Sequence, residues 1–128
     1  MNIALWIVQG LLAVMFLMAG MMKATKSKEE LKEAAGDNMA WVDSVSARNV
    51  RLIGILEVLI ALGLILPHLT GILPWLTPLA AVGFVCTMIG AAVLHVQRGD
   101  GAQGIVTNIV LLLLAAFVAY GRFVLIPA

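Results

Sequence analysis

Four long apolar segments alternate with short polar stretches along this chain. They cover residues 3–22, 50–66, 75–96 and 104–122. A helix needs roughly 20 mostly apolar residues to cross a bilayer, and about 17 is the lower end of the range. The pattern therefore predicts an all-α fold, an integral membrane four-helix bundle that forms a single domain over residues 1–128.

The composition supports this prediction. Hydrophobic residues make up 62% of the 128 residues and charged residues 12%, whereas soluble domains are about 45–50% apolar and about 25% charged. The lipid bilayer is therefore the expected partner, and a formal charge of +1 argues against nucleic acid. The single cysteine, Cys86, excludes an intramolecular disulfide and a Cys-x-x-Cys redox motif.

The longest polar stretch is the loop over residues 23–49. Ser27 is followed three residues later by Glu30, which is the spacing of a capping box, and Gly36 is a suitable helix stop. A short amphipathic helix is therefore predicted from about Lys28 to Ala35. The apolar residues 39–42 include a tryptophan, which favours the membrane interface.

The distribution of Lys and Arg predicts the orientation in the membrane. Loops one and three lie on one side and carry seven of the eight basic residues, so they are expected to face the cytoplasm and both termini the outside. These seven are Lys23, Lys26, Lys28, Lys32, Arg48, Arg51 and Arg98, and the eighth is Arg122.

Glu57 is the most informative single residue, because it lies within the apolar run of the second segment. An ionised carboxylate at mid-bilayer costs roughly 2.5–3.5 kcal/mol on insertion scales. It must therefore be neutral, paired or turned toward a polar cavity. Helical spacing places small residues, Gly54 and Ala61, on the same face, so the carboxyl group is expected to point into the bundle.

Other polar residues of the spans are candidates to meet it there. Gln9 is expected at a similar depth to the glutamate, and Asn108 and Thr107 are further candidate partners from the fourth helix. His95 and Arg51 are expected nearer the cytoplasmic face. Gln9, Asn108, Arg51 and His95 thus join the glutamate as candidate ligand-binding or proton-bearing residues. The simpler alternative is that these side chains only hold helices together, at about 0.6 kcal/mol per contact.

Metal chemistry is not supported by the sequence. The two histidines, His68 and His95, lie at opposite ends of the third segment, on the order of 30 Å apart. No cluster of His, Cys and carboxylates has the spacing of a zinc or iron site. No metal site is predicted, and no cofactor is evident from motifs.

A signature opens the second helix, Arg51-Leu-Ile-Gly54-Ile-Leu-Glu57. Gly63, Pro67 and the run over residues 73–81 follow it. With four helices in this order, the chain resembles the DoxX-like family of small bacterial membrane proteins, from the first helix to about Arg122. It departs from the family pattern in lacking a proline between Trp41 and Arg51.

The resemblance implies a multi-pass protein of the bacterial cytoplasmic (inner) membrane. Some relatives are subunits of a thiosulfate:quinone oxidoreductase, and others associate with superoxide dismutase and a sulfurtransferase. The implied role is a membrane subunit of a redox or thiol-stress system rather than a stand-alone enzyme. Such a subunit would bind a quinone or lipid beside Glu57, or anchor soluble redox partner proteins through loop 23–49.

Two other functions remain open from the sequence. Glu57 could serve a small proton-coupled transporter, or the chain could be a membrane assembly or scaffolding factor. A homo-dimer or higher oligomer is compatible with each of these functions.

Overall fold

The computed structural model describes residues 1–99 and 102–127, and its long elements are four helices. Each is long and apolar enough to cross a membrane, which confirms the predicted all-α membrane four-helix bundle. The helices and shorter elements are α1 (Asn2–Thr25), α2 (Lys28–Ala35), the 3-10 segment η1 (Gly36–Ser44), α3 (Ala47–Thr70), α4 (Leu76–Arg98), α5 (Ala102–Tyr120) and the π-helical turn η2 (Gly121–Leu125).

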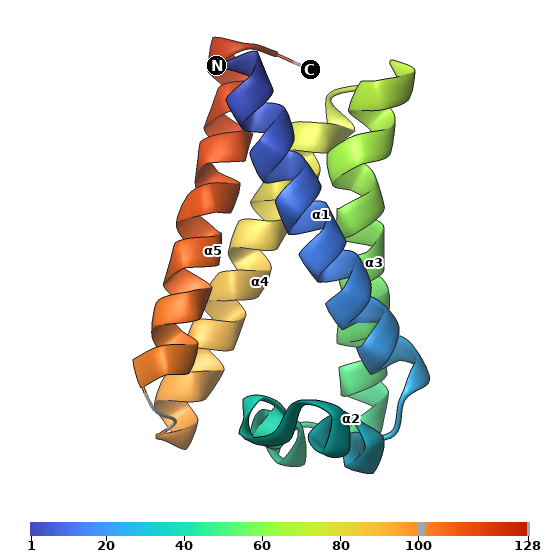
Figure 1. Cartoon of the computed structure of the whole chain (residues 1–128), viewed down its shortest axis with the longest axis vertical. Coiled ribbons are helices and arrows are strands. Elements are labelled where there is room, and N and C mark those ends of the chain that lie inside the picture. The colour runs from blue at the N-terminus through green and yellow to red at the C-terminus, as the bar shows by residue number, and fades with distance from the viewer. Residues whose placement is uncertain (100–101, 128) are drawn as a thin grey trace.

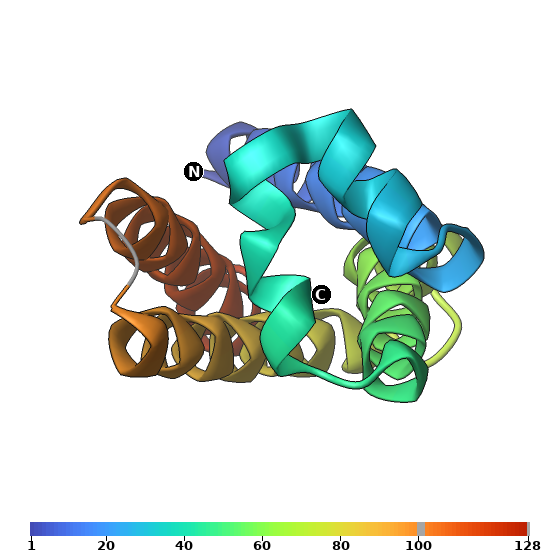
Figure 2. The ribbon, with the colours of Figure 1, turned by 90° about the horizontal axis from the view of Figure 1, so that it is seen from below.

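The bundle is built from two main helix pairs. α1 packs chiefly on α3, and α4 packs chiefly on α5, with α3 and α4 joining the pairs. Both chain ends lie at one end of the bundle (Figure 1). At the other end, α2 and η1 run across the bundle rather than along it (Figure 2).

The core lies where the four long helices meet, and it is apolar at its centre. Phe16 of α1 stacks on Phe84 of α4 with their ring centroids 3.7 Å apart. Only 17–28% of the most apolar window of each span is buried inside the protein. The remaining apolar surface is far larger than a soluble monomer exposes, so it belongs in contact with lipid.

α1 and α3 cross at two glycines, Gly20 and Gly54. A methyl group at Gly20 would lie 2.6 Å from the Gly54 carbonyl oxygen, and one at Gly54 would lie 2.7 Å from the Gly20 oxygen. Any side chain at either position would separate the helices. Small residues allow such close approach in membranes, where dispersion contacts replace the hydrophobic effect between helices.

Pro67 lies inside α3, where the sequence predicted a connecting loop. We expected the second helix to end at residue 66, but α3 continues for a further turn to Gly71, which is left-handed with φ +74°. Proline has no N–H, so the Gly63 carbonyl four residues earlier loses its helical donor. The hydroxyl group of the buried Thr77, on α4, donates to this carbonyl at 3.1 Å. A tertiary contact thus replaces the missing bond, and the helix continues.

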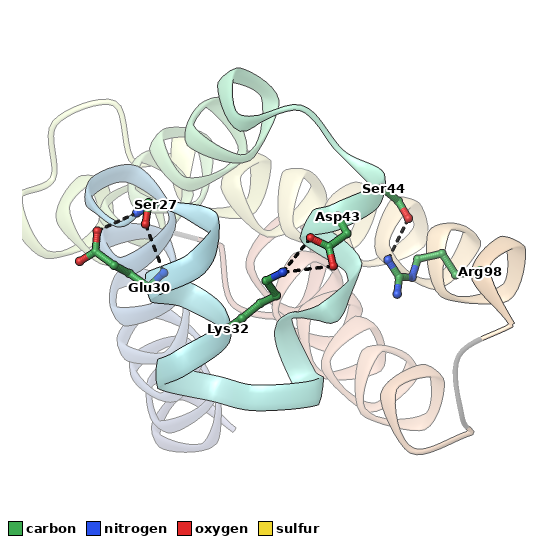
Figure 3. A network of polar contacts seen from close by, with 6 residues as sticks. All are labelled: Ser27, Glu30, Lys32, Asp43, Ser44 and Arg98. Atoms are coloured by element: carbon green, nitrogen blue, oxygen red, sulfur yellow. Dashed lines mark hydrogen bonds and ion pairs between the residues drawn. The ribbon is translucent and has the colours of Figure 1, made fainter.

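α2 forms as its sequence predicts, over Lys28–Ala35. The Ser27 hydroxyl accepts from the Glu30 N–H, and the Glu30 carboxylate accepts from the Ser27 N–H, both at 3.2 Å (Figure 3). The hydrogen bonds with Ser27, together with the charge of Lys26, hold the pKa of Glu30 below its ordinary value, against the opposing effect of desolvation. The capping box is therefore present in full.

The rest of loop 23–49 is folded against the bundle. Leu31 of α2, Val42 of η1 and Val50 of α3 form a second small apolar core. The Lys32 ammonium group pairs with Asp43 at 3.0 Å, and Arg98 of α4 donates to the Ser44 hydroxyl at 2.8 Å (Figure 3). The exposed ion pair contributes little to stability, about 0–1 kcal/mol. The apolar contacts therefore contribute most of the energy that holds the loop on the bundle.

The glycine crossing can be tested with two alanine substitutions in α1. Gly20→Ala places a methyl group against backbone atoms of α3 and should destabilise the fold by about 1–3 kcal/mol. The methyl group that Gly10→Ala adds would have no neighbouring atom within 4 Å. This variant should therefore leave stability unchanged or raise it slightly, because alanine has the higher helix propensity. The measurement is the thermal unfolding midpoint in mild detergent. Equal midpoints for the two variants would contradict the close crossing.

Candidate functional site

Glu57 lies at an ion pair near the α2 end of the bundle. Its side chain is 2% exposed, and the Lys23 ammonium group of α1 donates to its Oε1 at 2.5 Å. Gly54 lies one turn before Glu57, and its missing side chain lets Lys23 approach: a methyl group there would lie 2.7 Å from the Lys23 Cβ. The close crossing therefore positions a cation beside the buried carboxylate.

Trp41 of η1 covers this pair. The Lys23 Nζ lies 5.4 Å from the centroid of the Trp41 ring, within the range of a cation–π contact. Three elements thus meet at one charge pair: α1 supplies the cation, α3 the anion and η1 the aromatic cover. Desolvation strengthens the attraction within such a pair, and it also makes loss of either partner costly.

The expected contact between Glu57 and Gln9 is wrong. The Gln9 side chain is fully buried, and its Nε2 donates to the Leu64 carbonyl oxygen at 2.8 Å. Leu64 lies two turns beyond Glu57 on α3, or roughly 10 Å along the axis. The α1–α3 pairing thus brings Gln9 beside Leu64, about two turns from Glu57, and the two polar side chains lie at different depths.

The other candidates lie on α5, on α4 and near the start of α3. Asn108 is half-buried on α5, and its Nδ2 has no hydrogen-bond partner among the described residues, so it does not donate to Glu57. The half-buried His95 lies near Gly104, where an added methyl group would be 3.7 Å from its ring. Arg51 is exposed on α3. The cluster predicted around Glu57 is therefore replaced by a single ion pair with Lys23.

A second polar centre lies at the opposite end of the bundle, around Arg122 of η2. Its side chain is only 1% exposed. The Nε atom donates to the Gln9 Oε1 at 2.6 Å, and Nη1 donates to the Asn2 Oδ1 at 2.8 Å and the Ile126 carbonyl oxygen at 3.3 Å. These acceptors are neutral. Among the side chains that the structure describes, no Asp or Glu forms an ion pair with this guanidinium group.

Two aromatic rings accompany this cation. The Arg122 Cζ lies 5.5 Å from the centroid of the Trp6 ring. Trp6 stacks in turn on His68 of α3, with centroids 4.4 Å apart and an interplanar angle of 15°. Arg122 Nη2 and His68 Nδ1 are both buried with no hydrogen-bond partner in the described chain. Buried polar atoms are normally satisfied, and exceptions indicate strain, function or a missing ligand or water.

From the sequence, Arg122 was expected on the membrane side opposite the other seven basic residues, and no role was predicted for His68. One signal in the sequence points to Arg122: Asn108, Ala115 and Ala119 lie on the same helical face as it does. Small residues on one face are typical of a helix face that packs inside a bundle, and the burial of Ala115 and Arg122 agrees with this. What the pattern did not contain is that the start of α1 lies beside the end of α5, which brings Gln9 to Arg122.

A metal centre finds no support in the described part of the chain. Within it, no group of three or more His, Cys, Asp or Glu side chains is close enough to hold an ion.

Comparison with known proteins gives one family. A family model described as the DoxX-like family matches residues 7–118. No curated protein and no solved structure matched the chain. The matched range contains Lys23 and Glu57, whereas Trp6 and Arg122 lie just outside it.

The ion pair predicts an asymmetric response to mutation. Lys23→Met leaves the buried Glu57 without a partner and should cost about 3–5 kcal/mol. Glu57→Gln should cost less, because the long stem of Lys23 can extend its charge toward the interface. A Lys23→Met/Glu57→Gln double variant should recover part of the loss, measured by unfolding in detergent. Strictly additive losses would show that the two side chains do not stabilise one another.

Proposed function

Because the chain belongs to the DoxX-like family, we propose that it is a non-catalytic, ligand-binding membrane subunit of a redox or thiol-stress system. One observation carries the ligand-binding part of the proposal. Arg122 is a nearly fully buried cation whose Nη2 has no acceptor among the described residues. A group that donates so strongly is a good receptor for a carbonyl or anionic oxygen.

A quinone fits this chemistry better at Arg122 than at Glu57. A quinone carbonyl is an acceptor, and an ionised carboxylate is also only an acceptor. Glu57 is in addition occupied by Lys23. Arg122 offers a donor without a partner in the described chain, and the Trp6 ring, stacked on His68, lies beside it. We therefore place the ligand of the proposed subunit at the Arg122 end of the bundle.

The alternatives draw less support from the same contacts. A proton-coupled transporter needs a carboxyl group that exchanges its cation, and Glu57 holds Lys23 at 2.5 Å. Docking of soluble redox partners would use α2, but its exposed glutamates, Glu29, Glu30 and Glu33, stand beside Lys28 and Lys32, so its charge favours neither a basic nor an acidic partner surface. The extensive exposed apolar surface of the spans is compatible with a homo-dimer within the lipid.

Ligand binding should depend on Arg122. Loss of a hydrogen bond to a charged group costs about 1.5–3 kcal/mol, or about 10- to 150-fold in affinity. Arg122→Gln should weaken binding of a short-chain quinone by about this factor, and Arg122→Lys should have an intermediate effect because it keeps the charge without the planar fork. Quenching of tryptophan fluorescence during titration in mild detergent measures the affinity.

Glu57→Gln serves as the comparison in this titration, because it removes the other buried charge. It should leave quinone affinity within about twofold of the wild-type value, because the substitution removes no hydrogen-bond donor from the proposed ligand site. Unfolding midpoints of the variants must first show that each is folded. Loss of binding in Glu57→Gln with full binding in Arg122→Lys and Arg122→Gln would contradict the placement at Arg122.

The proposed orientation puts both termini outside the bacterial cytoplasmic membrane, with α2 and η1 in the cytoplasm. Its support is the seven-to-one distribution of Lys and Arg. In a Cys86→Ser background, Pro127→Cys, at an exposed position near the C-terminus, should react with a membrane-impermeant maleimide added to intact spheroplasts. Glu33→Cys, on the exposed face of α2, should react only after permeabilisation. The reverse labelling pattern would overturn the orientation.

A further inference from the structure

A hollow of about 280 Å³ lies at the α2 end of the bundle, apart from both polar centres. It forms where the end of α1, the start of α2 and the start of α3 come together. Its walls combine basic side chains with a small apolar floor. The residues that line it are Lys26, Ser27, Lys28, Glu29, Ala47, Val50 and Arg51.

The charge of this hollow is unbalanced. Lys26, Lys28 and Arg51 face one acidic residue, Glu29, which gives three positive charges and one negative, or a net +2. Among the described residues, none of the three cations forms an ion pair. The neighbouring Glu30 carboxylate, which accepts from the Ser27 N–H, still interacts with Lys26 and reduces the local excess to +1. Cations within a Debye length, about 10 Å at 0.1 M salt, repel one another, so an anion would relieve the repulsion.

Two helix N-termini add to the positive potential. α2 begins at Lys28 and α3 begins at Ala47, and both residues line the hollow. The first N–H groups of a helix have no partner within the helix, and the aligned peptide dipoles favour negative charge there. Main-chain donors and basic side chains therefore point to the same kind of ligand, an oxyanion.

The position of the hollow relative to the membrane spans indicates which molecule carries this oxyanion. Lys26 directly follows the span Asn2–Thr25, and Ala47 opens the span Ala47–Thr70. The hollow therefore lies where the hydrocarbon core gives way to headgroups, at the level of lipid phosphates. Basic pockets at the ends of transmembrane helices typically hold anionic headgroups. Along α3 from Arg51 toward the middle of the membrane, the exposed Ile55 and Leu59 follow at four-residue spacing and offer a surface for an acyl chain.

We propose that this hollow binds the phosphate group of an anionic phospholipid, with Lys26, Lys28 and Arg51 as its ligands. The site is independent of the ligand proposed at Arg122. It gives Arg51 a role beyond its contribution to the distribution of basic residues, and the ion pair at Glu57 does not involve Arg51.

The test compares two arginines of the same helix. Arg51 lines the hollow, whereas Arg48 is exposed on α3 and does not line it. Arg51→Gln and Arg48→Gln therefore remove the same charge from nearby positions. Native mass spectrometry of each variant in mild detergent counts the bound lipid during titration with phosphatidylglycerol, with phosphatidylcholine as the neutral lipid. Unfolding midpoints without added lipid confirm that both variants fold.

The proposal expects wild-type protein to bind phosphatidylglycerol in preference to phosphatidylcholine. Arg51→Gln should weaken this binding by at least about fivefold, the effect of one basic residue near an anionic surface. A Lys26→Gln/Arg51→Gln double variant should weaken it further, and Arg48→Gln should leave it within about twofold. Equal losses in Arg48→Gln and Arg51→Gln would reveal only general surface attraction and would overturn the proposal.

Competition with inorganic phosphate distinguishes a lipid headgroup from a free phosphate ion as the occupant of the hollow. Millimolar phosphate should not displace phosphatidylglycerol from the wild-type protein, because the acyl chains hold the lipid at the site. Phosphate binding that depends on Arg51, without any preference for the anionic lipid, would overturn the lipid assignment and leave a free-phosphate site.

Discussion

The close crossing of α1 and α3 at Gly20 and Gly54 is the constraint on which the rest of the structure depends. A methyl group on either glycine would lie 2.6–2.7 Å from backbone atoms of the other helix. This crossing determines the register of the two helices, and the register determines their polar partners. Lys23 reaches Glu57 next to the crossing, and Gln9 reaches the Leu64 carbonyl further along the same helix pair. A shift by one residue would separate both pairs, because helical neighbours rotate by about 100° per residue.

The buried charges of Glu57 and Arg122 lie in different environments. Glu57 has an opposite charge at 2.5 Å and an aromatic cover, so its local environment is complete. Arg122 is held by neutral acceptors and retains a buried donor with no partner in the described chain. Unpaired charge in a bilayer is expensive and is a hypothesis of function by default. The physical asymmetry is the reason for assigning a structural role to the first centre and a ligand to the second.

The Arg-x-x-Gly-x-x-Glu signature divides into three physical roles along two turns of α3. Gly54 allows the close approach of α1, and Glu57 receives the lysine that this approach delivers. Arg51 is exposed and lines the basic hollow at the membrane boundary. The spacing of three residues places the glycine and the glutamate near one face, next to α1. One short motif thus joins helix packing, charge compensation and a surface that suits anionic lipid.

The sequence by itself determined the four spans, the all-α membrane fold and the capped helix α2, because hydrophobic periodicity and capping are local properties of the chain. It also identified Glu57 and Gln9 as buried polar residues. Only the tertiary structure decided their partners, since register between helices depends on the close approach of two glycines that are distant in sequence. It likewise decided the length of α3: Pro67 is a helix-ending signal in the sequence, but Thr77, from another helix, supplies the missing donor. Long-range contacts of this kind leave no periodic signal in the sequence.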